Sequence, residues 1–111
     1  MVWDIIQRLL NDNAIRFAAV MGLIETIGDF FLKKYALTDQ VGYLFGTIGS
    51  YGGIIYIFQR ALRIEKLGRV NGAWNAITTI SNLLVGMSLG ETYSITQLIG
   101  LVLIACGIIL I

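Results

Sequence analysis

Three long stretches of this chain carry no charged residue, and they restrict what it can fold into. They run from Gln40 to Gln59, from Val70 to Gly90 and from Thr92 to Ile111, and each is 20 or 21 residues long. A helix needs roughly 20 apolar residues to cross the hydrocarbon core of a bilayer. A soluble helical bundle would place charged residues on the outer face of each helix, and these stretches have none. We therefore expect membrane-spanning helices.

A fourth stretch of similar length, Ala14 to Lys33, is interrupted only by Arg16, Glu25 and Asp29. Charged residues make up 14% of the chain, against about 25% in ordinary soluble domains. At 111 residues the chain has room for one domain. We expect an all-α fold, a single domain over 14–111 in which four transmembrane helices form a bundle, at about 14–35, 41–63, 70–89 and 94–111.

The first 13 residues, MVWDIIQRLLNDN, have a different pattern. Trp3, Ile6 and Leu10 share one face of a helix, and polar residues occupy the other. This pattern predicts a short amphipathic helix over 1–13 that lies in the membrane interface, with Trp3 at headgroup depth. A cleaved signal peptide fits less well, because the apolar region starts late and no small-residue cleavage site follows.

The basic residues are distributed unevenly between the two sides that four spans would create. One side holds both termini and the second loop, with Arg8, Arg16, Arg60, Arg63, Lys66 and Arg69. The other side holds only Lys33 and Lys34. Lysine and arginine accumulate on the cytoplasmic side of membrane proteins. We therefore expect a multi-pass integral membrane protein with both termini in the cytoplasm or its topological equivalent.

Small residues follow one face of two predicted helices. In the second span Gly42, Gly46, Gly49 and Gly53 recur at helical spacing, and in the fourth Gly100 and Gly107 lie seven residues apart. Small residues allow helix backbones to approach closely in lipid. We therefore predict that these glycines are helix-packing positions.

The third predicted span carries a polar stripe made of Asn71, Asn75, Thr78 and Asn82, with Trp74 beside it. Amides that face lipid are costly, so the stripe is expected to face other helices or a wet cavity. Interhelical hydrogen bonds that fix the packing, and the lining of a cavity, are both open interpretations.

Two acids in the first predicted span need an explanation. Glu25, Asp29 and Lys33 follow at intervals of four residues and share a helix face. Asp29 can pair with Lys33, which would extend to the interface. Glu25 lies deeper and has no partner within its own helix. Intramembrane acids are functional candidates by default, because a carboxylate there must bind a proton, a cation or a polar partner.

Other classes of function have little support in the sequence. The chain has no histidine, and its single Cys106 lies in an apolar run as a packing residue. We see no nucleophile–base pair, metal cluster or phosphate loop, so we expect neither an enzyme nor a cofactor or metal site. The net charge of +1 gives no reason to expect nucleic acid as a partner.

Nearly the whole chain from Ala14 resembles the small multidrug resistance transporters, within the drug/metabolite transporter superfamily. The segment IETIGDFFLKK is similar to their first-helix motif, with Glu25 at the membrane-embedded glutamate. Tyr51 and Trp74 fall at the spacing of their second-helix tyrosine and third-helix tryptophan. The segment GETYSITQLIGLVLIACGIILI is similar to the start and glycine seam of the superfamily's last helix. Asp29 is an addition, because the family has an uncharged residue there.

The resemblance implies a proton-coupled exporter of small organic cations that works as an oligomer. Glu25 would bind either protons or substrate, with Tyr51 and Trp74 as the aromatic wall of the substrate cavity. If the polar stripe lines that cavity, Asn71, Asn75 and Thr78 belong to it as well, and Asp29 is a secondary acid that the family lacks. In the family, two antiparallel subunits share one cavity. The uneven basic residues instead favour a single orientation. The alternative hypothesis is therefore a non-transporting structural or accessory protein within a larger assembly, such as a viral or organellar membrane complex or a flippase subunit.

Overall fold

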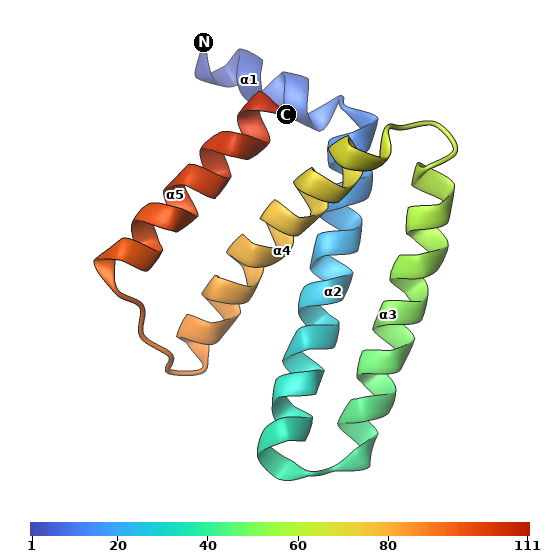
Figure 1. The fold of residues 1–111 in the computed structure, drawn as a ribbon, viewed down its shortest axis with the longest axis vertical. Helices are drawn as coiled ribbons and strands as arrows, with labels where there is room; N and C mark the ends of the chain where they lie inside the picture. Colours follow the sequence, from blue (N-terminus) through green and yellow to red (C-terminus); the bar gives the residue numbers. More distant parts are fainter.

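The computed structural model describes all 111 residues as an all-helical chain without strands (Figure 1). All five predicted helices are present, close to their predicted bounds, so the all-α class is confirmed. They are α1 (Val2–Leu10), α2 (Asn13–Thr38), α3 (Val41–Ala61), α4 (Leu67–Ser88) and α5 (Ile95–Leu110).

The long helix α2 is the centre of the arrangement. It packs against α3 on one side and α4 on the other, and α5 lies along the far side of α4 (Figure 1). The molecule is therefore flat, with extents of 46 × 37 × 21 Å. The short helix α1 runs across one end of the layer.

The two ends of the layer differ in their loops. Both termini and the α3–α4 loop lie together at one end (Figure 1). We call it the basic end, because it carries Arg8, Arg16, Arg60, Arg63, Lys66 and Arg69. The α2–α3 turn and the α4–α5 loop lie at the opposite end, which we call the far end. Asp39 closes the α2–α3 turn in the left-handed conformation, with φ of 57°.

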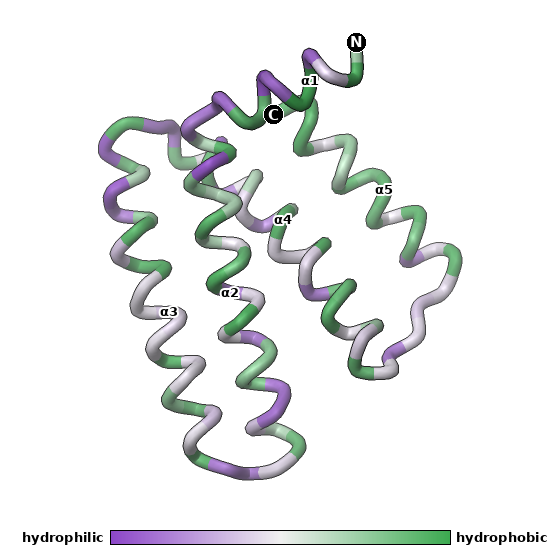
Figure 2. The backbone as a smooth tube through the Cα atoms, turned by 180° about the vertical axis from the view of Figure 1, so that it is seen from behind, coloured by the Kyte–Doolittle hydropathy of each residue, from purple (hydrophilic) through white to green (hydrophobic).

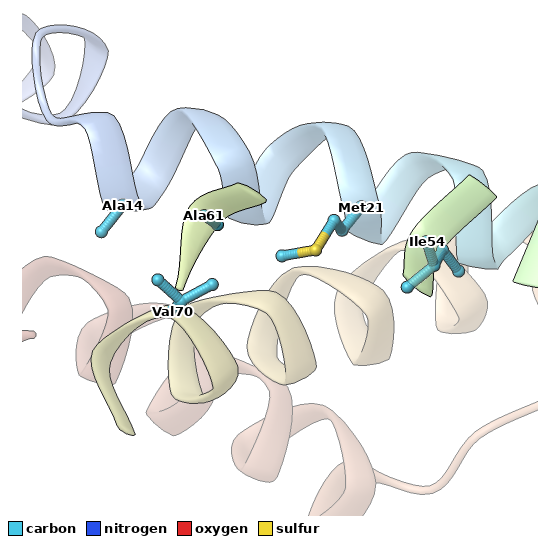
Figure 3. Close-up of a cluster of buried hydrophobic side chains, with 5 residues drawn as sticks. All are labelled: Ala14, Met21, Ile54, Ala61 and Val70. Carbon is cyan, nitrogen blue, oxygen red and sulfur yellow. The ribbon is translucent and has the colours of Figure 1, made fainter. Parts of the chain in front are cut away.

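The core is small and is built where α2, α3 and α4 meet. Figure 3 shows its side chains, which are Ala14, Met21, Ile54, Ala61 and Val70. Small residues bring the helices close together elsewhere along α2. A Cβ atom at Gly22 would stand 2.7 Å from Ile77, and one at Gly28 would stand 3.0 Å from Ser50. These two glycines of α2 are the close-packing positions toward α4 and α3.

The predicted glycine seams are mostly not packed within the chain. Gly46 does lie against the ring of Phe31. A Cβ atom would meet nothing within 4 Å at the other predicted positions, Gly42, Gly49, Gly53, Gly100 and Gly107. These five glycines are therefore not close-packing positions within a single chain, because α3 buries a different face, with Thr47, Ile54 and Ala61, and no residue of α5 is buried. Their contact with another chain stays a prediction.

Apolar residues recur along the helices (Figure 2), and many of them are exposed. Only 13 of the 111 residues are buried, and large apolar side chains on α3 and α5 are exposed, among them Phe45, Ile55 and Leu103. By length and composition, one helix could cross a membrane, and it is Val41–Ala61. The helix Ile95–Leu110 is apolar but shorter. Charged side chains in α2 and amides in α4 lower the mean hydropathy of these helices. Of the four predicted membrane spans, only α3 is therefore both long and apolar enough.

Candidate functional site

An open groove of about 310 Å³ lies beside Glu25, and we call it the Glu25 groove. Its walls are Glu25 from α2, Tyr51, Ile54 and Ile55 from α3, and Trp74 from α4. The structure thus brings together three residues that the resemblance assigned to one site although they are far apart in the sequence. A carboxylate between two aromatic rings and two isoleucines is a setting suited to a cation with apolar substituents.

Glu25 receives one hydrogen bond, and it comes from another helix. The buried Thr78 hydroxyl of α4 donates to Glu25 Oε2 at 3.0 Å. No basic side chain forms an ion pair with Glu25. The carboxylate therefore has a neutral hydrogen-bond donor within the chain and no compensating charge.

Trp74 is held in place by its packing. Its ring lies 5.1 Å from that of Phe58, between centroids, in a tilted arrangement. Its indole Nε1 is buried and has no acceptor within the chain. An indole N–H without a partner is unusual, because buried polar groups are nearly always hydrogen-bonded.

Asp29 occupies a second polar cluster one helical turn from Glu25. The Tyr51 hydroxyl donates to Asp29 Oδ1, and Asn82 Nδ2 of α4 donates to Asp29 Oδ2 at 2.8 Å. The predicted pair between Asp29 and Lys33 is wrong, since Lys33 Nζ instead lies 3.6 Å from Glu91 Oε2 in the α4–α5 loop. The reason is tertiary: α3 and α4 supply donors to Asp29, and the loop brings a carboxylate to Lys33.

A cavity of about 260 Å³ opens next to Asp29 toward the far end, and we call it the Asp29 cavity. Its polar lining consists of Asp29, Lys33, Asn82 and Glu91, and Phe30, Val85, Gly86 and Leu89 complete the wall. Tyr51 stands between the two sites, because its ring lines the Glu25 groove while its hydroxyl bonds to Asp29.

The residues of the polar stripe on α4 have two different environments. Thr78 and Asn82 bond to the two acids of α2. Asn71 and Asn75 are exposed, and Asn75 lines a separate cavity of about 350 Å³ between α4 and α5. Asn71 and Asn75 therefore do not line the Glu25 groove in this chain, because α2 covers only part of the stripe.

Sequence reasoning missed two residues of these sites. Asn82 belongs to the predicted stripe, but nothing in the pattern indicated that it would bond to Asp29. Glu91 belongs to the segment that resembles the start of the superfamily's last helix, but nothing indicated that it would pair with Lys33. The stripe did indicate that α4 needs polar partners, and Glu25 was the acid of α2 without a partner in its own helix.

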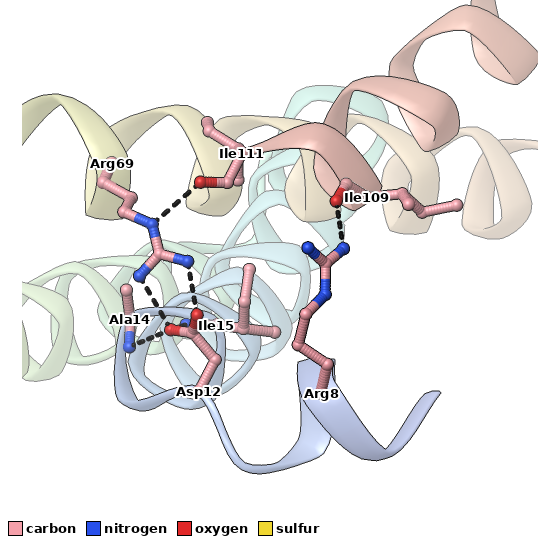
Figure 4. A network of polar contacts seen from close by, with 7 residues as sticks. All are labelled: Arg8, Asp12, Ala14, Ile15, Arg69, Ile109 and Ile111. Carbon is pink, nitrogen blue, oxygen red and sulfur yellow. Dashed lines mark hydrogen bonds and ion pairs between the residues drawn. The ribbon is translucent and has the colours of Figure 1, made fainter. Parts of the chain in front are cut away.

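A third polar cluster lies at the basic end and ties four helices together (Figure 4). Asp12 caps α2 by accepting from the backbone N–H groups of Ala14 and Ile15, and it forms a two-bond ion pair with Arg69 of α4. The hydrogen bond from Arg69 lowers the pKa of the Asp12 carboxyl below its ordinary value.

The same cluster holds the last turn of α5. Arg69 Nε donates to the carbonyl oxygen of Ile111 at 2.8 Å, and the Arg8 guanidinium of α1 donates to that of Ile109. Basic groups at a helix C-terminus satisfy its free carbonyls and suit its dipole. This cluster is structural, since its charges are used in contacts between helices.

Comparison of the chain with protein-family models, curated proteins and solved structures found no match. Function is therefore inferred from the geometry of these sites and from the sequence pattern.

Proposed function

We propose that this chain is a multi-pass membrane protein that exports small organic cations in exchange for protons. The observation that carries the proposal is the Glu25 groove, where a carboxylate without a basic partner stands beside Tyr51 and Trp74. Aromatic faces attract cations, most strongly where water is excluded.

The exchange follows from the charge of Glu25. An ionised acid at the centre of a transmembrane helix costs roughly 3 kcal/mol on insertion scales, so the groove favours a neutralised state. A proton on Glu25 and a cation beside it both achieve this, and each excludes the other. Loading a cation from one side and a proton from the other would couple the two movements.

Placement in a bilayer is supported by the exposed apolar surface and by the basic end. Helix α5 is about 24 Å long at the usual rise per residue, which is shorter than a typical hydrocarbon core of about 30 Å. Membranes accommodate such a mismatch by local thinning or by extended flanking side chains. The six basic residues would place the basic end on the cytoplasmic side.

The test is transport by the purified chain in lipid vesicles that carry a proton gradient. Tetraphenylphosphonium serves as the probe cation, and its movement and the accompanying pH change are followed together. Glu25→Gln should abolish proton-coupled transport, whereas Glu25→Asp should retain part of it. Asp39→Asn, which alters an exposed acid in the α2–α3 turn, is the matched control. Normal transport by Glu25→Gln would refute the proposal.

A second candidate is an accessory, non-transporting subunit, and one observation favours it. The basic residues stand six against two between the ends, which favours one fixed orientation instead of an antiparallel pair of copies. The exposed glycines of α3 and α5 would then contact a different chain. Proton-coupled transport by vesicles that contain this chain alone would rule the accessory role out.

A further inference from the structure

We propose that Asp29 is a second proton-binding site, separate from Glu25 and filled from the far end through the Asp29 cavity. The inference rests on the membrane placement proposed above. It concerns an acid to which neither the resemblance nor the Glu25 groove gives a role.

Asp29 has no ion-pair partner within the chain, although Lys33 lies one turn away on the same helix. The ammonium group of Lys33 forms its ion pair with Glu91 and not with Asp29. A carboxylate among packed helices in lipid needs a compensating charge. Because Lys33, which lines the same cavity, is paired with Glu91, a cation from outside would complete the neutralisation of Asp29.

A proton is the cation that fits Asp29. Tyr51 O–H and Asn82 N–H both donate to the carboxylate, so they hold it in its ionised form, and its remaining lone pairs can accept a proton from the cavity. A metal ion would need several oxygen ligands turned toward it, and no group of three or more acids, cysteines or histidines is placed to hold one. A proton needs only one carboxylate oxygen and a path from water.

The Asp29 cavity gives water a path to the carboxylate. It reaches from the carboxylate past Asn82 to Lys33 and Glu91 at the far end. Those two side chains are 48% and 42% exposed, so the mouth is open to water. The Glu25 groove, by contrast, has an almost wholly apolar wall. The charged or titratable groups around Asp29 are thus Glu25 and Lys33 on α2, Tyr51 on α3 and Glu91 in the loop, while α4 contributes none.

The chemical step is the transfer of one proton from water in the cavity to Asp29. A hydronium ion in the cavity gives its proton to one Asp29 oxygen, an O–H bond forms and water is released. The new hydroxyl must then donate, and the oxygen of Tyr51 can accept because its own hydroxyl hydrogen rotates about the C–O bond. That hydrogen would turn away from Asp29, and the same Tyr51 side chain lines the Glu25 groove. Protonation of Asp29 would thus change the hydrogen bonding of Tyr51, a side chain of that groove.

Infrared difference spectroscopy of the full chain in lipid vesicles tests the inference without any transport measurement. Protonated and ionised carboxyl groups absorb at separate frequencies, so proton uptake is counted directly. In a Glu25→Gln background, a carboxylic acid band should grow as the pH falls from alkaline to mildly acidic. Adding Asp29→Asn should remove one carboxyl group per chain from that band, whereas adding Asp39→Asn should leave it unchanged. An equal band in the Asp29→Asn variant overturns the inference.

A second measurement covers the case in which Asp29→Asn fails to fold. Tyr51→Phe and Asn82→Ala each remove one donor to the ionised carboxylate, so the band should appear at higher pH in both variants. An unchanged titration in both overturns the inference as well. These outcomes are independent of whether Glu25→Gln still transports, so failure here is distinguishable from failure of the proposed function.

Discussion

The ion pair between Asp12 and Arg69 offers the sharpest test of how the helices are held together. The pair has two bonds, and its side chains are 19% and 32% exposed. Net hydrogen bonds to charged groups contribute about 1.5–3 kcal/mol, and fully exposed pairs about 0.2–1 kcal/mol. Since this pair lies between those cases, Asp12→Asn should lower the free energy of unfolding by about 1–2 kcal/mol.

Asparagine keeps the cap on α2, because its side-chain oxygen can still accept from the N–H groups of Ala14 and Ile15. Asp12→Ala loses the cap as well, which should cost about 1 kcal/mol more. The assay is reversible unfolding in mixed detergent micelles, followed by far-ultraviolet circular dichroism. Asp4→Asn is the matched control, since Asp4 is 88% exposed and should contribute almost nothing.

The same pair predicts a pH dependence with a definite sign. The hydrogen bond from Arg69 lowers the pKa of Asp12 in the folded state, so its contribution is present above the ordinary carboxyl value of 3.8. It is lost as the pH falls below that value and through the lower folded pKa. Wild type and Asp12→Asn should therefore converge in acid. Equal stabilities at neutral pH, or a difference that persists undiminished in strong acid, would refute the reasoning.

Further predictions concern packing and the far end, measured by the same unfolding assay. Gly28→Ala should destabilise the chain by about 1–3 kcal/mol, because its Cβ would press on Ser50 and Tyr51. Gly49→Ala meets nothing and should be neutral or stabilising, so equal costs would contradict the packing of α2 on α3. A double-mutant cycle on Lys33 and Glu91 should give a coupling below about 1 kcal/mol that falls with salt, because both side chains are well exposed.

Within a single chain the glycine stripe of α3 illustrates how a regular pattern can mislead. The spacing of Gly42, Gly46, Gly49 and Gly53 was a sound reason to predict close packing. Yet α3 turns Thr47 and Ile54 toward α2, and Thr47 donates to the carbonyl oxygen of Gly28 at 3.0 Å. A periodic face identifies a candidate interface, but it does not say which of two candidate faces another helix will cover.

The amino-acid sequence by itself determined the helices, their approximate bounds and the gathering of basic residues at one end. These features depend on local composition and on the 3.6-residue period, which can be read along the chain. The pattern singled out Glu25, and the resemblance to a transporter family added Tyr51 and Trp74 as candidates for the same site.

Only the tertiary structure decided which polar groups meet. Asp29 had Lys33 at a favourable spacing, but its partners are Tyr51 and Asn82, which lie 22 and 53 positions away along the chain. Their meeting depends on how far α3 and α4 rotate about their own axes as they pack on α2. That rotation is set by the shapes of many side chains together, such as Met21 and Ile54 in the core, and no local pattern encodes it.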